Sequence, residues 1–141
     1  MAFEFEFELP ENPTGTAQQK GVSTAGGRVR FYTKDTVMKT RRMYAIAIRD
    51  CFRRLGVPIP HFDGAVGARI VFTFAVKNKR LWGAYKPTVP DADNVVKLLL
   101  DVLTADLHFW RDDAQVAILE VTKLYGEKST VHIILEELKN D

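Results

Sequence analysis

The stretch from residue 68 to residue 104, ARIVFTFAVKNKRLWGAYKPTVPDADNVVKLLLDVLT, contains the patterns that decide the fold. Residues 68–76 are rich in β-branched and aromatic side chains, which is typical of a strand. Residues 93–104 form an apolar run that opens with Asp93, a residue type preferred at helix starts. The stretch therefore predicts a strand, a basic and aromatic loop over 77–90, and a helix over about 93–104.

Upstream of this stretch, two patterns predict further regular elements. Residues 2–9 alternate Phe and Glu with period two, as in a half-buried strand, until Pro10 stops the pattern. Residues 34–55 carry apolar side chains at helical spacing, and Gly56 ends the predicted helix. Residues 10–30 between them are rich in Pro, Gly, Thr and Ser with interspersed basic residues, which predicts a flexible basic loop.

Downstream, residues 114–125 and 130–138 alternate and contain enough Val, Ile and Thr to be two strands joined at Gly126. Adjacent strands of this kind typically form a hairpin. The predicted order is β, loop, α, β, α, β, β, and the predicted class is α+β, close to α/β, with helices packed on a mixed sheet. The length of 141 residues predicts one domain over 1–141.

Composition excludes several classes of protein. Hydrophobic residues make up 46% and charged residues 27% of the chain, which is ordinary for a globular protein. The apolar runs are far shorter than the roughly 18 residues of a membrane span. The N-terminus is acidic and alternating, unlike a secretory signal. Cys51 is the only cysteine, so no intrachain disulfide can form, and a reducing cytoplasm is the expected location.

The charges are segregated along the chain, although the net charge is only +2. Residues 12–90 hold 15 basic and 3 acidic side chains, whereas residues 91–141 hold 5 basic and 11 acidic ones. A basic segment attracts a phosphate backbone, and aspartates beside it repel that backbone unless a cation intervenes. The pairing suggests a metal together with nucleic acid, although a solvated basic face that balances an acidic one is the simpler alternative.

The aspartates follow a spacing that can build a cation site. If Asp93 begins the helix and Asp91 lies in an extended lead-in after Pro90, both carboxylates converge before the positive helix end. Lys97 and Asp101 follow at intervals of four on the same helical face. A third carboxylate from the pair Asp112-Asp113 completes an oxygen-rich site for Mg²⁺, which suits phosphodiester hydrolysis with Lys97 neutralising phosphoryl charge.

Each feature also has a purely structural interpretation. Asp-x-Asp before an apolar helix is commonly a capping turn, Asp93 with Lys97 an exposed i,i+4 pair, and Asp112-Asp113 a polar turn. The three histidines show no metal-ligand spacing and are interpreted as loop, turn and strand residues. The aromatic side chains near the motif can stack on bases or stabilise loops, and Trp110 is interpreted as a packing residue.

Taken together, the run Asp91-x-Asp93-Asn94-x-x-Lys97-x-x-x-Asp101, the run Phe109-Trp110-x-Asp112-Asp113-x-Gln115-Val116 and the later Lys123 closely resemble the signature of RusA-type Holliday junction resolvases. The resemblance implies a small bacterial or phage endonuclease that depends on Mg²⁺, or on Mn²⁺ in its place, and acts as a homodimer on four-way DNA junctions and other branched DNA. It implies that Asp91, Asp93 and Asp113 bind the metal and that these three and Lys97 are catalytic. Asp101 and Asp112 match recurrent acidic positions and are possible supporting acids.

The sequence thus predicts a metal-dependent endonuclease that resolves Holliday junctions by paired symmetric nicks in DNA recombination and repair. A two-fold dimer offers two identical sites to the two equivalent strands of a junction. The alternative is a noncatalytic nucleic-acid-binding module whose aspartates cap a helix and balance charge. The basic residues predicted to contact DNA are Lys20, Arg28, Arg30, Lys34, Lys77, Lys79, Arg80 and Lys86.

Overall fold

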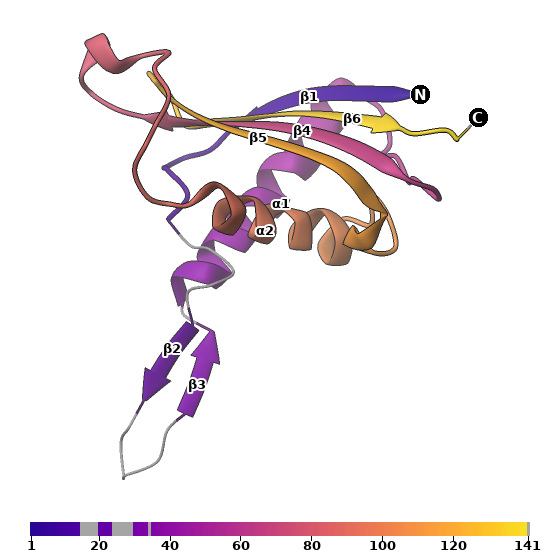
Figure 1. Ribbon diagram of the computed structural model, residues 1–141, viewed down its shortest axis with the longest axis horizontal. Helices are drawn as coiled ribbons and strands as arrows, with labels where there is room; N and C mark the ends of the chain where they lie inside the picture. The colour runs from indigo at the N-terminus through magenta and orange to yellow at the C-terminus, as the bar shows by residue number, and fades with distance from the viewer. Residues whose placement is uncertain (15–19, 24–29, 34, 141) are drawn as a thin grey trace.

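The computed structural model describes residues 1–14, 20–23, 30–33 and 35–140 (Figure 1). Its centre is a four-stranded mixed sheet in the order β1-β6-β4-β5, made of β1 (Ala2–Glu8), β4 (Val66–Ala75), β5 (Val116–Gly126) and β6 (Thr130–Glu137). Helices α1 (Asp35–Leu55) and α2 (Ala92–Asp101) lie on the same side of this sheet in Figure 1. The predicted α+β class, with helices packed on a mixed sheet, is confirmed.

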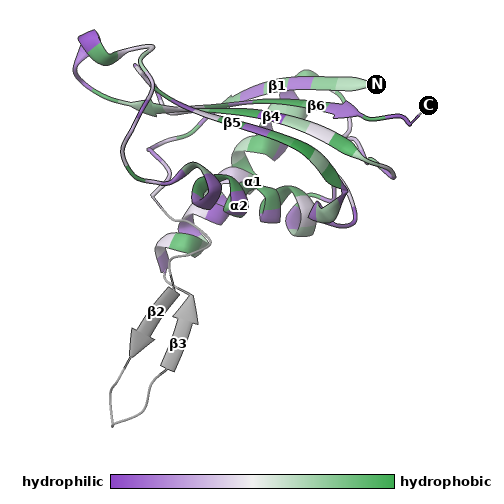
Figure 2. Ribbon diagram, in the orientation of Figure 1, coloured by the Kyte–Doolittle hydropathy of each residue, from purple (hydrophilic) through white to green (hydrophobic). Residues whose placement is uncertain are grey.

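The apolar core lies between the helices and one face of the sheet. Along β1 the side chains of Phe5 and Phe7 are buried and the intervening glutamates are exposed, as the alternation predicted. Burying one such aromatic side chain contributes about 1.5 to 3 kcal/mol. The ring of Phe5 packs against Phe52 of α1 and Phe109, with centroids 4.9 and 5.9 Å away. Figure 2 shows hydrophobic positions along the strands and on both helices, broken by hydrophilic ones.

The predicted hairpin between the last two strands is wrong. β4 lies between them, parallel to β5 and antiparallel to β6. The turn from Gly126 to Thr130 therefore crosses the end of β4, and Val76 donates a backbone hydrogen bond to the Gly126 carbonyl (3.0 Å). A Cβ at Gly126 would lie 2.4 Å from the Thr73 side chain, so this crossing requires a glycine. The strand pattern was correct, but adjacency in sequence did not produce pairing.

The segment predicted as a loop over 10–30 contains regular structure at its end. Strand β2 (Lys20–Ser23) pairs antiparallel with β3 (Arg30–Thr33), and the pair projects away from the main sheet in Figure 1. The prediction missed these strands because each has only four residues and most of the 10–30 segment consists of Pro, Gly, Thr, Ser and Gln, which is typical of a loop. Residues 15–19 and 24–29 lie outside the described residues, so the predicted flexibility stays a prediction.

The second helix is α-helical only to Asp101, whereas the prediction extended it to about residue 104. The chain continues as a π-helical turn over Val102–Asp106. None of the helices that the structure describes combines the length and the apolar character that a membrane crossing requires.

Candidate active site

The N-terminal end of α2 places two carboxylates where the sequence predicted them. Asp91 is the N-cap residue, with extended backbone (φ −64°, ψ 144°), and its carbonyl accepts a hydrogen bond from Val95 (3.0 Å). Asp93 lies in the first turn. Both side chains are exposed, and the positive end of the helix dipole favours negative charge there. The predicted extended lead-in followed by a first-turn aspartate is therefore confirmed.

Lys97 connects this helix to the Asp112-Asp113 turn. Its Nζ donates to Asp101 Oδ1 at 2.9 Å and to Asp113 Oδ2 at 2.8 Å. The hydrogen bond from Lys97 holds the pKa of Asp113 below its usual value, and the hydrogen bonds to Asp113 and Asp101 raise the pKa of Lys97. The ammonium thus stays protonated at neutral pH and supplies a fixed positive charge. Tertiary structure brings Asp113 to the helix face that carries Asp93, Lys97 and Asp101.

The turn that carries Asp113 is held by its neighbours. The Asp112 carboxylate accepts a hydrogen bond from the Ala114 backbone at 2.9 Å, and Gln115 completes a capping box by accepting from Asp112. The Gln115 amide also donates to the carbonyls of Phe62 and Gly64, at 2.9 and 3.0 Å. Asp112 therefore has the turn-capping role that its structural interpretation predicts. Sequence reasoning gave Gln115 no such role, because its two carbonyl acceptors lie about fifty residues away in sequence.

The segment leading into Asp91 is fixed to strand β5. Lys123 Nζ donates to the carbonyls of Thr88 and Pro90, at 2.6 Å each. The backbone of this segment also pairs with the edge of β5, because Lys86 donates to the Lys123 carbonyl at 2.9 Å. The motif includes Lys123, but the sequence alone predicts no contact for it. A signal was present, since this lysine interrupts the apolar alternation of its strand.

The predicted metal ligands have suitable chemistry, but they do not form a compact cluster. Among the described residues, no group of three or more His, Cys, Asp or Glu side chains is arranged to hold a metal ion. The structure records no side-chain hydrogen bond or ion pair for Asp91 or Asp93 within the described part of the chain, whereas Asp113 is paired with Lys97. Exposed carboxylates without partners fit a hard cation such as Mg²⁺. The assignment of these ligands stays a prediction.

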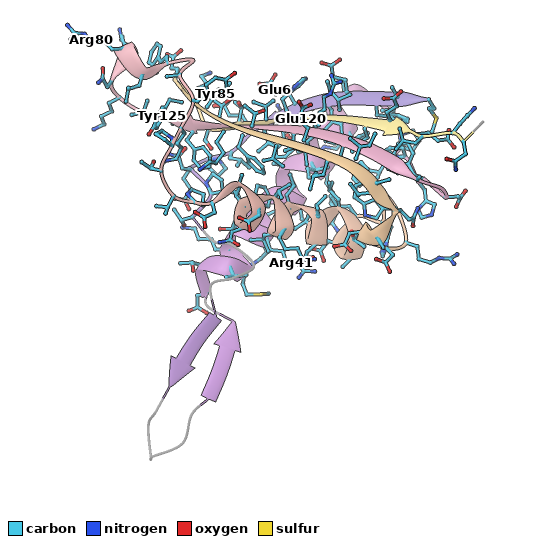
Figure 3. All side chains as sticks on the ribbon, viewed as in Figure 1. Glu6, Arg41, Arg80, Tyr85, Glu120 and Tyr125 are labelled. Atoms are coloured by element: carbon cyan, nitrogen blue, oxygen red, sulfur yellow. The ribbon has the colours of Figure 1, made fainter. Side chains whose placement is uncertain are left out.

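The described members of the predicted DNA-binding set lie in two segments, the β2–β3 pair and the 77–90 segment. Lys20 and Arg30 belong to β2 and β3, and Arg28 and Lys34 lie outside the described residues. Side chains on the 77–90 segment are largely exposed, and Figure 3 shows Arg80 at its outer tip. Their contacts with DNA stay a prediction. The exposed basic residues of this segment are Lys77, Lys79 and Arg80.

Lys86 differs from the other basic residues of this segment. It is half-buried, donates to Thr88 Oγ1 at 2.6 Å, and lies 5.2 Å from the ring centroids of both Phe74 and Tyr125. These contacts engage the Lys86 ammonium within the fold. Figure 3 shows Tyr125 at the end of the sheet from which the 77–90 segment extends.

The aromatic and histidine interpretations are confirmed where the structure tests them. Trp110 is fully buried, and its indole donates to Thr104 Oγ1 at 2.7 Å, so it is a packing residue. His61 lies in a loop, His108 lies in a turn with a positive φ of 56°, and His132 lies in β6. His61 Nδ1 lies 2.8 Å from the His108 carbonyl, and His132 lies 2.7 Å from Glu4, which are structural contacts.

Comparison with known proteins gives two matches that cover most of the chain and a third that covers less than half of it. The family model described as endodeoxyribonuclease RusA matches residues 10–136. The crossover junction endodeoxyribonuclease rusA of Lactococcus phage r1t is 35% identical over 142 residues, which span 98% of this chain and 100% of that protein. The uncharacterized protein YqaN of Bacillus subtilis (strain 168) is 38% identical over 63 residues, 44% of this chain and 43% of that protein.

Proposed function

The chain belongs to the endodeoxyribonuclease RusA family, and we propose that it resolves four-way DNA junctions by Mg²⁺-dependent hydrolysis of phosphodiester bonds. One observation carries the proposal: the similarity to a crossover junction endodeoxyribonuclease extends over nearly the full length of both chains. The acidic residues around Lys97 support it, because a nuclease of this kind needs oxygen ligands and a positive charge beside the scissile phosphate.

In this proposal Asp91, Asp93 and Asp113 bind the cation. Bound Mg²⁺ polarises the scissile phosphate and acidifies a water molecule. Lys97 stays protonated and directs its ammonium at the negative charge that develops on the phosphoryl oxygens. Gln115 and the capping carboxylate of Asp112 keep the turn carrying Asp113 in place, and Asp101 accepts a second hydrogen bond from the Lys97 ammonium.

The exposure of the site supports its use on a large substrate. The Lys97 side chain is 46% exposed and that of Asp113 is 33% exposed, so a phosphate backbone can reach both groups. In Figure 1 the 77–90 segment extends from the end of the sheet and leads into α2, and the β2–β3 pair extends from the start of α1 away from the sheet. We propose that these two projections hold the junction arms.

A junction has two equivalent strands to cut, which supports a two-fold homodimer with one site in each subunit. The lone cysteine, Cys51, supports action in the reducing cytoplasm, where no disulfide is needed. The noncatalytic module is the weaker alternative, because membership of an endonuclease family supports a role for the carboxylates beyond capping.

Cleavage of a synthetic four-way junction tests the proposal. With Mg²⁺ the protein is expected to cut two opposing strands symmetrically, and with excess EDTA it should bind the junction and leave it intact. Linear duplex of the same sequence should be cut far more slowly under the same conditions. Junction binding without strand cleavage at any Mg²⁺ or Mn²⁺ concentration would support the noncatalytic module instead.

Salt dependence tests the basic segment. Neutralising Lys77 and Arg80 together to Gln is expected to reduce the slope of log affinity against log salt by about 1.8, because each phosphate contact on duplex DNA contributes about 0.9. Arg69→Gln is the matched control, since Arg69 lies on β4 away from this segment and pairs with Glu120 (3.0 Å). A slope equal to that of the unaltered protein would place the DNA-binding surface elsewhere.

A further inference from the structure

We propose that Lys123 is a positioning residue for the Asp91 carboxylate, because its ammonium fixes the main chain from which Asp91 emerges. The inference rests on the proposed function, in which Asp91 binds the cation. Lys123 itself is not proposed to touch the cation or the DNA. It acts through the carbonyl groups of Thr88 and Pro90, to which its Nζ donates at 2.6 Å each.

The location of Lys123 in the sheet is unusual for a lysine. It lies in β5 beside Phe72 of β4, and Phe72 belongs to the buried face that packs under the helices. The preceding residue of β5 on that face, Val121, packs against the core. An apolar side chain is the ordinary choice at such a position, because a partly buried ammonium must recover its lost hydration.

The acceptors of this ammonium are main-chain carbonyls and not carboxylates. Among the described residues, no carboxylate oxygen lies within 4.0 Å of Lys123 Nζ, and its hydrogen bonds go to Thr88 and Pro90. A hydrogen bond from a charged donor is shorter and stronger than a neutral one. Pro90 directly precedes Asp91, so this bond constrains the peptide unit that joins the two residues.

A second contact orders the same segment without reaching Pro90. Lys86 donates through its backbone to the Lys123 carbonyl and through its Nζ to Thr88 Oγ1. Asp91 has no side-chain capping bond of its own. The position of the Asp91 carboxylate therefore depends on the main chain that precedes Asp91. Lys123 supplies the side-chain contact to Pro90, the residue directly before Asp91.

The test separates positioning from simple stabilisation of a loop. Metal-free protein is titrated with Mn²⁺ by calorimetry, and single-turnover junction cleavage is measured as a function of Mg²⁺ concentration. Lys123→Met removes the ammonium and keeps the length of the side chain, whereas Lys123→Arg keeps charged donors. Lys128→Met is the matched control, because Lys128 is exposed and its Nζ lies 4.0 Å from Glu8. Melting temperatures are recorded for all variants.

Loss of an outer contact of a metal ligand typically weakens metal affinity about 10- to 100-fold. We expect Lys123→Met to weaken Mn²⁺ binding at least about tenfold and to raise the half-saturating Mg²⁺ concentration similarly. The cleavage rate at saturating Mg²⁺ should change far less. Lys123→Arg should restore most of the affinity, and Lys128→Met should match the unaltered protein.

The inference would be overturned if Lys123→Met bound Mn²⁺ within about twofold of the affinity of the unaltered protein, because a loss of about tenfold is expected. This holds even if the melting temperature of the variant falls. If the methionine variant does not fold, Lys123→Gln, which keeps one donor pair, decides the question by the same two measurements. Normal cleavage combined with no effect at Lys123 would reject this inference alone. Failure of the unaltered protein to cut junctions with any metal would reject the proposed function.

Discussion

Asp93→Asn is expected to bind four-way junctions almost as tightly as the unaltered protein and to cut them on the order of 10³-fold more slowly. The substitution removes one charged oxygen ligand of the metal. Stabilisation of transition-state charge by a metal is worth several kcal/mol, and each 1.4 kcal/mol changes the rate about tenfold. Folding should be nearly unchanged, because Asp93 is exposed and only its favourable interaction with the helix dipole, about 0.3 to 1 kcal/mol, is lost.

Single-turnover cleavage at saturating enzyme and a binding assay in EDTA measure the two expectations separately. Asp63→Asn is the matched control, since the Asp63 side chain is 95% exposed and lies in a loop before β4. Near-normal cutting by Asp93→Asn at ordinary Mg²⁺ concentration would remove Asp93 from the metal ligands.

Lys97→Ala is expected to fold normally and bind junctions with near-normal affinity, but to lose about 10² to 10³ in single-turnover rate. Removing one charged or hydrogen-bonding group aimed at transition-state charge typically costs this much. An exposed i,i+4 pair alone would contribute about 0.3 to 0.5 kcal/mol of stability and nothing to the rate. A loss in single-turnover rate smaller than about tenfold, or 1.4 kcal/mol, would contradict the catalytic role and leave Lys97 as an exposed helix residue whose ion pairs are structural.

The pH dependence of this variant gives a second measurement. Because the pKa of Lys97 is raised, its ammonium is charged throughout the neutral range, and the loss in rate should be equal across that range. The pKa of Asp113 is lowered by the same contact, so the pair contributes stability that is lost as pH falls through the folded-state pKa of Asp113. Lys97→Ala lacks that contribution, and its melting temperature should fall less steeply on acidification. Lys128→Ala is the control for removal of an exposed lysine charge.

The local patterns predicted the elements that form the site. Asp91, Asp93 and Lys97 lie within seven residues, so helix geometry and capping preference alone place them relative to one another. The same holds for β1, whose alternation of Phe and Glu specifies a buried and an exposed face without reference to the rest of the chain. The motif around these aspartates also indicated the family, which the comparisons confirm.

Pairings between distant segments were not predictable in the same way. The turn after β5 has the length of a hairpin turn, so a hairpin would place β6 beside β5. In the structure β4 lies there instead. A parallel pair such as β4 and β5 needs a long crossover, which here runs through α2. Nothing in the local sequence of β6 reveals whether it pairs with β5 or with the free edge of β4.

By itself, the sequence determined the α+β class, the two helices, the four strands of the sheet and the acidic run with Lys97 at the start of α2. Only the tertiary structure decided that β4 separates β5 from β6, that Lys97 bonds Asp113, and that Lys123 and Gln115 hold the two segments bearing Asp91 and Asp113. The physical reason is the distance in sequence over which each interaction acts. Periodicity and capping act over a few residues, whereas these side-chain contacts join groups between 16 and 53 residues apart, and both they and the strand pairing depend on how the whole sheet is packed.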